Sequence, residues 1–342
     1  MTRNIKVQGD SISLTKHFGA GVTIYGSAEK GLVSRISDTE FTICGQPSLG
    51  RDCVQYHMNG DLNTSFFKGN SIHRTISRGV TLQDVSYLRI QDNVGYLISG
   101  HNIYLKDGSE QHNLIERNLM LSSLNSYNLL QTDVSVASYA ITNPLNMLRW
   151  NRAAGSDYYG FLLDIKRNPQ SASFVADMCP TGLPLGELQN NTAHSNQKIG
   201  LRISQLWSSQ YPCKPIRNDN DVDPWLSNPS IQNRFADNIL WGNGETGLLA
   251  EHIGNTLFEN FVVGSNLKSG LEFYKTNFTK ESVIAKNFTI VGQSSSSHVP
   301  VSSISSMNGI ITSRTDGSGY QLLRFFNFPD TSTGISVGSR NT

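Results

Sequence analysis

Short runs of apolar residues, separated by polar turn residues, recur along the whole chain. The runs are rich in Val, Ile, Leu and Phe and are bounded by Gly, Asn, Ser and Pro, which is the pattern of many short strands. No apolar stretch approaches the roughly 20 residues that a membrane-spanning helix needs. The pattern therefore predicts an all-β protein with no membrane insertion by this segment.

The apolar and polar positions also repeat as a longer phrase. Its four clearest copies are MLRWNRAAGSDYYGFLLDI (147–165), ELQNNTAHSNQKIGLRIS (187–204), RFADNILWGNGETGLLAEH (234–252) and LFENFVVGSNLKSGLEFY (257–274). In three copies an Asn lies nine residues before a Gly, namely Asn151 and Gly160, Asn191 and Gly200, and Asn238 and Gly247; Asn260 and Gly270 are one residue further apart. Internal similarity of this kind is the signature of a repeat protein.

The repeated phrase predicts a parallel β-solenoid, in which each coil stacks on the next at about 4.8 Å. We expect the turn Asn to accept a positive φ and its amide to bond the equivalent amide one coil away, while the Gly permits a second bend. An antiparallel sandwich is the competing interpretation. Hairpin signals are scarce, however, because Asn-Gly occurs only at 59–60, 243–244 and 308–309.

The rhythm of the repeats suggests how the chain is organised. We predict a β-helix over residues 1–293, with long excursions at about 167–186 and 208–230 that concentrate Pro, Ser and Asn. Residues 294–342 are interpreted as a Ser-rich loop, a last coil and a C-terminal tail. The first residues, MTRNIKVQGD, lack the apolar core of a signal peptide and read as a strand, so we expect a fragment of a larger protein.

Charge, cysteine content and sequons indicate the partners and the cellular location of the protein. Charged residues make up 16% of the chain with a net charge of +1, so no basic field exists to hold nucleic acid. The four cysteines allow three pairings; we interpret Cys44 with Cys53 and Cys179 with Cys213, the second of which would join the two excursions. Sequons stand at Asn63, Asn190, Asn277 and Asn287. These signals predict an extracellular or cell-surface glycoprotein of the secretory pathway.

Five consecutive phrases carry a family resemblance. They are YHMNGD (56–61), NSIHRTISRGVTL (70–82), VGYLISGHNIYLKDG (94–108), SYAITNPLNMLRWNRAAGS (138–156) and LGELQNNTAHSNQKIGLRI (185–203). In this order they resemble the extracellular β-helix of the cell-surface and cell-migration-inducing hyaluronidases and of fibrocystin and fibrocystin-L, over about residues 2–265. The resemblance implies a right-handed parallel β-helix in a large ectodomain. It also implies calcium-dependent cleavage of hyaluronan in some members and an adhesive or receptor-like role in the fibrocystin branch.

Under the resemblance, one group of residues is the candidate for glycosidic cleavage. Such cleavage needs an acid with a carboxylate partner, or a base with a charge stabiliser. The candidates are His57, Asp61, His73, Arg78, His101 and Asp107, with the three histidines expected to line one groove. The chain departs from the hyaluronidase-like pattern where Gln55 replaces a histidine and Lys106 replaces a carboxylate. The alternative is a hydrogen-bonded network that ties adjacent coils together, and we favour it.

Two further groups are candidates for ligand binding. Asp219, Asp221 and Asp223 alternate as calcium ligands do, yet the glycine and closing glutamate of an EF-hand are missing, so a solvated acidic loop is favoured over weak calcium binding. No other cofactor is predicted. Trp207 and Trp225, at the second excursion, are candidates for stacking on sugar rings, or equally for capping the core. Trp150 and Trp241 are interpreted as corner packing.

The sequence thus favours a non-catalytic structural or recognition module that engages glycans or extracellular proteins at the cell surface or in a matrix. The alternative is a hyaluronidase-like glycosaminoglycan depolymerase that uses the six residues above. A third interpretation is self-association into a filament, because an uncapped terminal coil can pair with another chain.

Overall fold

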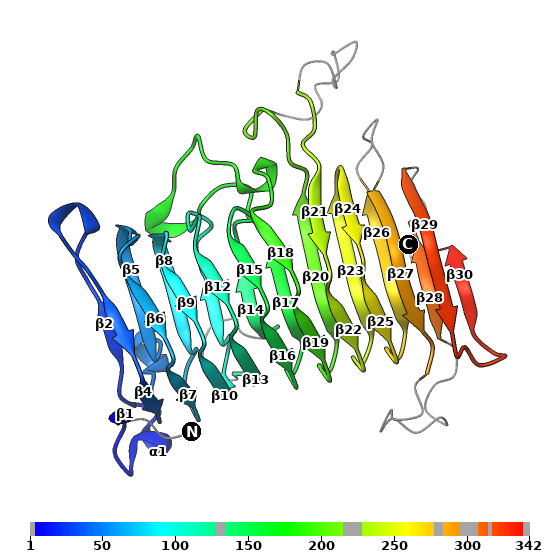
Figure 1. Cartoon of the computed structure of the whole chain (residues 1–342). Coiled ribbons are helices and arrows are strands. Elements are labelled where there is room, and N and C mark those ends of the chain that lie inside the picture. Colours follow the sequence, from blue (N-terminus) through cyan, green and yellow to red (C-terminus); the bar gives the residue numbers. More distant parts are fainter. Residues whose placement is uncertain are drawn as a thin grey trace.

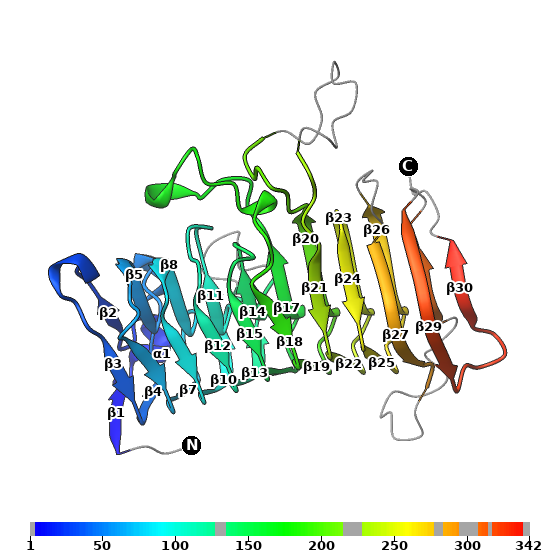
Figure 2. The same ribbon diagram turned by 45° about the horizontal axis from the view of Figure 1, so that its top comes forward.

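The computed structural model describes residues 4–126, 135–214, 228–276, 283–293, 307–313 and 317–337. Within these ranges the named strands pair only in parallel, in one sheet of 19 strands and one of 11. Figures 1 and 2 show the strands stacked side by side in chain order from β2 to β30. The predicted right-handed parallel β-helix is confirmed, and the antiparallel sandwich is excluded.

Each full coil passes through three columns of strands. The first column holds β3 (Arg35–Ser37), β6 (Phe66–Lys68), β9 (Arg89–Gln91), β12 (Leu114–Glu116), β15 (Met147–Arg149), β18 (Glu187–Gln189), β21 (Asn233–Ala236) and β24 (Thr256–Glu259). The second holds β1 (Ile5–Gln8), β4 (Thr39–Thr42), β7 (Ser71–His73), β10 (Val94–Ser99), β13 (Leu119–Leu124), β16 (Arg152–Ala154), β19 (Thr192–His194), β22 (Ile239–Trp241) and β25 (Val262–Gly264). The longer strands β27 (Val283–Val291) and β29 (Ser318–Phe326) span both columns.

The third column forms the second sheet. It holds β2 (Val22–Ile24), β5 (Val54–Asp61), β8 (Val80–Ser86), β11 (Ile103–Leu105), β14 (Ala137–Ile141), β17 (Tyr159–Asp164), β20 (Ile199–Leu206), β23 (Thr246–Ile253), β26 (Ser269–Thr276), β28 (Asn308–Thr312) and β30 (Thr333–Val337). The described helices are short, namely α1 (Ser13–Lys16), η1 (Ala28–Lys30), η2 (Pro47–Leu49), η4 (Ser171–Ser173) and η5 (Pro180–Gly182). Strands β28 to β30 extend the same stack beyond residue 293.

The core is built by stacking like on like. Tyr139 pairs with Phe161 across neighbouring coils, and their rings stack with centroids 4.7 Å apart. Further along, Phe261 and Phe288 stack at 5.1 Å. All four side chains are almost fully buried. Because every coil adds an apolar layer in register, the core continues along the solenoid instead of closing into a sphere.

A ladder of asparagines runs along the corner between the first and second columns. The backbone N–H of Asn118 donates to Oδ1 of Asn151 at 3.1 Å, and the Asn118 side-chain amide donates to the same oxygen at 3.0 Å. The same pattern continues to Asn191 and, through the backbone N–H, to Asn238. The predicted amide ladder is therefore confirmed, and it satisfies buried polar groups that strand pairing leaves over.

The expected turns differ from the structure in two details. In the copies that carry Asn151 and Asn238, the positive φ belongs to the residue before the asparagine, with φ of 53° at Trp150 and 56° at Asp237. In the fourth copy Asn260 itself has a positive φ of 59°, as expected. The repeat glycines do not bend the chain. Gly200 lies near the start of β20, in the third column, and has an ordinary strand conformation. A Cβ at this position would lie 2.8 Å from the carbonyl oxygen of Gly247 in the next coil. Glycine is needed at this position for close approach rather than for a turn.

The two predicted disulfides are present. Cys44 bonds to Cys53 beside the second coil, and Cys179 bonds to Cys213, joining the two excursions. Both excursions leave the same edge of the stack, which Figure 1 shows in green. Part of the second excursion, residues 215–227, lies outside the described residues, as does the Ser-rich run 294–306. Among the described residues no helix is long and apolar enough to cross a membrane.

Candidate functional site

The N-terminal half of the third column gathers polar side chains on its outward surface. Strand alternation buries Val80, Leu82, Ile103 and Leu105 and turns their neighbours outward. Register then places His57 beside Gln83 in adjacent coils. We call this surface the polar face and define it as His57, Arg78, Gln83, His101, Lys106 and Asp107.

Arg78 and His101 form a buried cluster on the polar face. The Arg78 guanidinium lies 3.7 Å from the Asp52 carboxylate and 5.0 Å from the centre of the Tyr104 ring. The His101 ring lies 4.8 Å from the same tyrosine, and its Nδ1 accepts the Ala137 N–H at 3.0 Å. That bond assigns the neutral tautomer with its proton on Nε2. Because Arg78 and His101 are only 4% and 3% exposed, the cluster fastens successive coils together.

A second network on the polar face connects an imidazole to a carboxylate through an amide. Nδ1 of His57 lies 3.0 Å from Oε1 of Gln83, and Nε2 of Gln83 donates to Oδ2 of Asp107 at 2.8 Å. Ser173, in the first excursion, donates its hydroxyl to the same Asp107 oxygen at 2.8 Å. Lys106 donates weakly to Gln83 at 3.5 Å. The Asp107 carboxylate is thus buried beneath η4 and already occupied by two donors.

Glu110 shapes the loop that carries Asp107. Its carboxylate is fully buried and accepts the backbone N–H groups of Asp84, Asp107 and Gly108 at 2.8–3.1 Å. Burial is the main influence and raises the pKa of Glu110, although the three backbone donors oppose the rise. Glu110 therefore acts as the internal support of the polar face rather than as an exposed acid.

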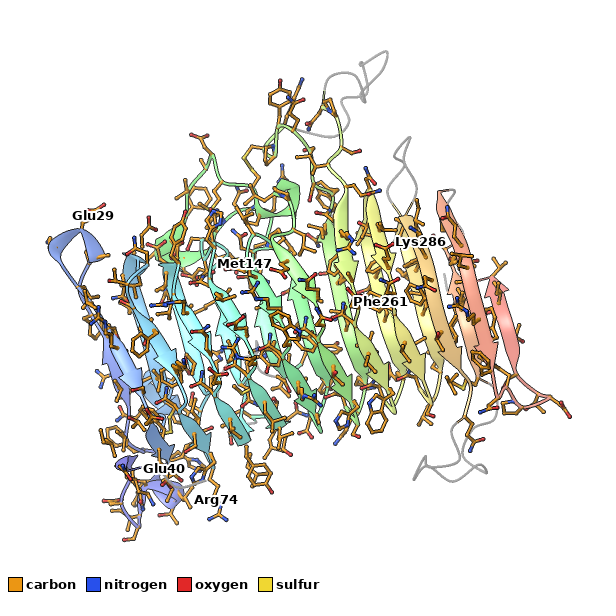
Figure 3. The ribbon with its side chains drawn as sticks, in the orientation of Figure 1. Glu29, Glu40, Arg74, Met147, Phe261 and Lys286 are labelled. Carbon is orange, nitrogen blue, oxygen red and sulfur yellow. A yellow bond between two sulfur atoms is a disulfide. The ribbon has the colours of Figure 1, made fainter. Side chains whose placement is uncertain are left out.

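The remaining predicted catalytic residues lie elsewhere. His73 is on β7 in the second column, where its Nε2 is 3.0 Å from Oε1 of Glu40. Burial tends to raise the pKa of Glu40, but the bonds from His73 and Lys6 outweigh it and the net pKa is lowered. Figure 3 shows Glu40 at the N-terminal end of the stack. Asp61 is exposed at the end of β5. The expected single groove of three histidines is therefore wrong, because a corner separates His73 from His57 and His101.

The tryptophans are also arranged differently from the sequence interpretation. Trp150 and Trp241 are 47% and 45% exposed, so they are surface residues and not corner packing. Trp207 is half-buried, and its backbone N–H donates to the Thr181 carbonyl at 2.9 Å, at the foot of the excursions. Its role in sugar binding stays a prediction. Trp225 lies outside the described residues.

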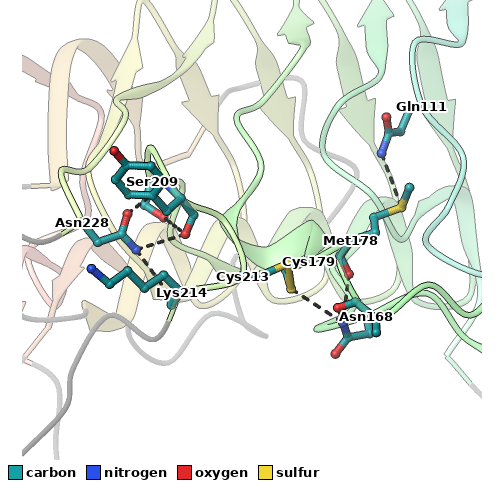
Figure 4. Close-up of a disulfide and its surroundings, with 10 residues drawn as sticks. Gln111, Asn168, Met178, Cys179, Ser209, Cys213, Lys214 and Asn228 are labelled. Atoms are coloured by element: carbon teal, nitrogen blue, oxygen red, sulfur yellow. Dashed lines mark hydrogen bonds between the residues drawn. A yellow bond between two sulfur atoms is a disulfide. The ribbon is translucent and has the colours of Figure 1, made fainter.

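A hollow of about 470 Å³ lies beside the Cys179–Cys213 disulfide. Figure 4 shows this disulfide and the bond from the Gln111 amide to the Met178 sulfur, 3.4 Å long. Asn168 donates to the Met178 carbonyl at 2.9 Å. The Asn168 bond closes the first excursion on itself, and the Gln111 contact holds the excursion against the body of the solenoid.

The predicted metal ligands lie outside the described residues, whereas three of the four predicted glycosylation sites lie within them. Asp219, Asp221 and Asp223 lie outside the described residues, and within the described ranges no three acidic, histidine or cysteine side chains cluster as metal ligands. Asn63 is exposed in a turn, and Asn190 is half-buried at a corner. The Asn287 amide donates to Asn260 at 2.7 Å, so a glycan there would have to break that bond. Asn277 is not among the described residues.

Comparison with known proteins gives a family match. A family model described as the CEMIP beta-helix matches residues 17–201. Mouse fibrocystin-L is 32% identical over 243 residues, which cover 70% of this chain and 6% of that protein. The human cell surface hyaluronidase CEMIP2 is 30% identical, covering 60% of this chain and 18% of its own, and the human cell migration-inducing and hyaluronan-binding protein is 29% identical, covering 76% and 22%. The chain therefore spans only a small part of these relatives.

The A-module of Azotobacter vinelandii mannuronan C-5 epimerase AlgE4 is 12% identical, with a TM-score of 0.40, and the match covers 92% of this chain and 90% of that one.

Proposed function

Because the chain belongs to the CEMIP beta-helix family, we propose that it is a non-catalytic recognition module of an extracellular glycoprotein. In this role it engages glycans or protein partners at the cell surface or in a matrix. Two relatives are named as a hyaluronidase and as a hyaluronan-binding protein, which supports glycans as the ligand class. The two disulfides belong to the oxidising environment of the secretory pathway.

One observation carries the proposal, namely the Gln83 amide between His57 and Asp107. Glycosidic cleavage requires a group that delivers a proton and a carboxylate that acts with it. Here the His57 imidazole meets an amide, which neither accepts nor delivers a proton at neutral pH. The Asp107 carboxylate is 1% exposed and is held by Gln83 and Ser173. A buried network of this kind supports a structural role for these residues better than acid–base chemistry.

The substitutions noted in the sequence support the same proposal. Gln55 stands where the hyaluronidase-like pattern has a histidine. Its side chain lies on the third column and is 9% exposed. Lys106 replaces a carboxylate and places its ammonium beside Gln83. The first change removes an imidazole and the second a carboxylate, and these are the two kinds of group that general acid–base cleavage uses.

The proposal is tested by incubating the purified chain with high-molecular-mass hyaluronan and calcium. The expected result is unchanged polymer size. Shortening of the polymer that is lost in Asp107→Asn and His57→Gln, and kept in His73→Gln on the second column, would overturn it. His73→Gln is a matched control because it removes an imidazole from a different surface.

The alternative is a calcium-dependent hyaluronidase-like depolymerase. One specific observation favours it, since His57, Arg78, His101 and Asp107 do share the polar face while His73 and Asp61 do not. Calcium, if required, would have its candidate ligands in the Asp219 to Asp223 run. Removal of calcium with a chelator separates the two candidates, because only the depolymerase would lose an activity.

Self-association is the remaining part of the proposal. The last described strands expose Phe326, Ile335 and Val337, at 50%, 50% and 72%. Exposed apolar side chains of this kind favour association with another chain. Sedimentation velocity over a range of concentrations tests it: we expect larger species that diminish in Val337→Lys, and a strictly monomeric chain would contradict this part.

A further inference from the structure

We propose that a second surface of the solenoid, the tryptophan face, binds a carboxylate-bearing polysaccharide. The tryptophan face is defined as Trp150, Arg152, His194 and Trp241. It lies on the corner and outward surface of the second column, away from the polar face of the third column. The proposal rests on the proposed function, because it specifies the kind of glycan that the module recognises and where it binds.

Two indole rings on this face are exposed and held in place. The Trp241 ring stacks on the His194 imidazole of the neighbouring coil, with centroids 4.3 Å apart and planes 10° apart. The Arg149 guanidinium lies 5.2 Å from the centre of the Trp150 ring. Each ring nevertheless leaves nearly half of its surface to solvent. Rigid exposed aromatic planes suit the apolar faces of pyranose rings, which lose little conformational entropy when they stack.

The positive charge of Arg152, beside Trp150, indicates an acidic sugar. Arg152 is exposed on β16 and forms no ion pair with any residue that the structure describes. Its neighbour Arg117 is bonded to Asp92 and Glu116 and so is already neutralised. Burial lowers the pKa of His194, and the nearby Arg152 charge lowers it further, so His194 adds no charge at neutral pH. Arg152 is therefore the available cation, and carboxylate is the anion that its planar fork matches.

The shape of the face matches an extended polymer. Arg152, Trp150, Arg117 and Leu119 line a surface depression of about 720 Å³. Arg152 is in register with Thr192, and Thr192 with Ile239, so the row continues along the solenoid axis. Trp150 and Trp241 stand two coils apart, or about 10 Å along the axis at the usual strand spacing. Two separated aromatic planes, with a cation beside the first, fit a linear sugar chain, whereas a stable protein interface needs roughly 800 Å² on each partner.

Binding of a short hyaluronan oligosaccharide, measured by isothermal titration calorimetry, tests the proposal. We expect Trp241→Ala and Trp150→Asn each to weaken binding about tenfold through loss of stacking. Asparagine is chosen at position 150 because it tolerates the positive φ there. Arg152→Gln is also expected to weaken binding about tenfold and to reduce its dependence on salt. The same oligosaccharide can be prepared with its carboxylates reduced to alcohols. Its affinity for the wild type should be as low as the affinity of the acidic oligosaccharide for Arg152→Gln.

Matched controls come from exposed residues elsewhere. Phe174→Ala, in the first excursion, removes an aromatic ring that is 62% exposed, and Arg51→Gln removes an exposed cation near Cys53. Both controls should bind like the wild type, and thermal unfolding should show all variants folded. Equal binding by the face variants, equal binding of the reduced oligosaccharide, or no binding by the wild type would overturn the inference. Cleavage of the polymer would instead overturn the proposed function and leave the location of this face intact.

Discussion

Asn118 and Asn151 lie one above the other in adjacent coils, and the Asn118 side-chain amide donates to Oδ1 of Asn151 at 3.0 Å. Asn118 also donates to the Ile90 carbonyl at 2.9 Å and accepts the Asn93 backbone N–H at 3.0 Å. One buried side chain thereby connects its own coil to the coil before it and the coil after it. The corner of the solenoid is held by polar contacts as well as by the apolar core.

Removing this amide should destabilise the fold strongly. In Asn118→Ala the buried Asn93 N–H and Ile90 carbonyl lose their partner, and we expect a loss of about 3 kcal/mol in the free energy of unfolding. Urea unfolding followed by circular dichroism measures it. Asn63→Ala, in an exposed turn, serves as the control and should change stability by less than about 0.5 kcal/mol. Equal effects of the two substitutions would contradict the role of the ladder.

A methyl group at Gly200 should be poorly tolerated. Its Cβ would lie 2.8 Å from the Gly247 carbonyl oxygen, which belongs to the backbone of the next coil. We expect Gly200→Ala to cost about 1–3 kcal/mol through overpacking. Gly21→Ala is the matched control, because there the nearest atom to the new Cβ would be 3.5 Å away. Thermal unfolding of both variants decides; a Gly200→Ala protein as stable as the control would show that adjacent coils can move apart.

The Glu259 carboxylate should contribute stability at neutral pH and lose it in acid. Bonds from Lys286 and Arg234 lower the pKa of Glu259 below its ordinary value of 4.5. The charged form is therefore favoured in the folded chain, so the contribution is present above about that pH and disappears as the pH falls through the folded pKa. The pair is largely solvated, so the effect is small. The difference in melting temperature between wild type and Glu259→Gln should shrink in acid, and a widening difference would contradict this account.

The two disulfides should differ in their resistance to reduction. Cys44 and Cys53 are fully buried, whereas Cys213 is exposed at the base of the second excursion. Because exchange requires access of a thiolate to sulfur, mild reduction should open Cys179–Cys213 first. Alkylation followed by mass spectrometry identifies the released thiols. Release of Cys44 and Cys53 at the same or lower reductant concentration would be inconsistent with the structure.

The repeating parts of the fold were predictable because their signals are local. A ladder asparagine such as Asn151 and a close-contact glycine such as Gly160 occur together in one coil and again in later coils. Their spacing therefore appears in the sequence as a repeated phrase. The surface chemistry was not predictable in the same way. Between Asn93 and Asn238 the ladder steps are 25, 33, 40 and 47 residues, because excursions of different length leave individual coils.

Variable coil length hides which column a polar residue occupies. His73 and His57 are close in sequence, yet a corner separates them, and the corner is set one residue earlier than the ladder asparagine suggests. The exposure of Trp241 depends on which face of its strand the side chain occupies. It also depends on the ring of His194, which lies in register in the coil before it. Likewise Gln83 is unremarkable in sequence and becomes central only when the register places it between His57 and Asp107.

The size distribution of hyaluronan after prolonged incubation with the wild-type chain and calcium tests the central claim most directly. The proposed recognition module predicts polymer that elutes at its original size while it retains bound protein. Progressive shortening of the polymer, with Asp107→Asn inactive and stably folded, would contradict it and establish the polar face as a catalytic site.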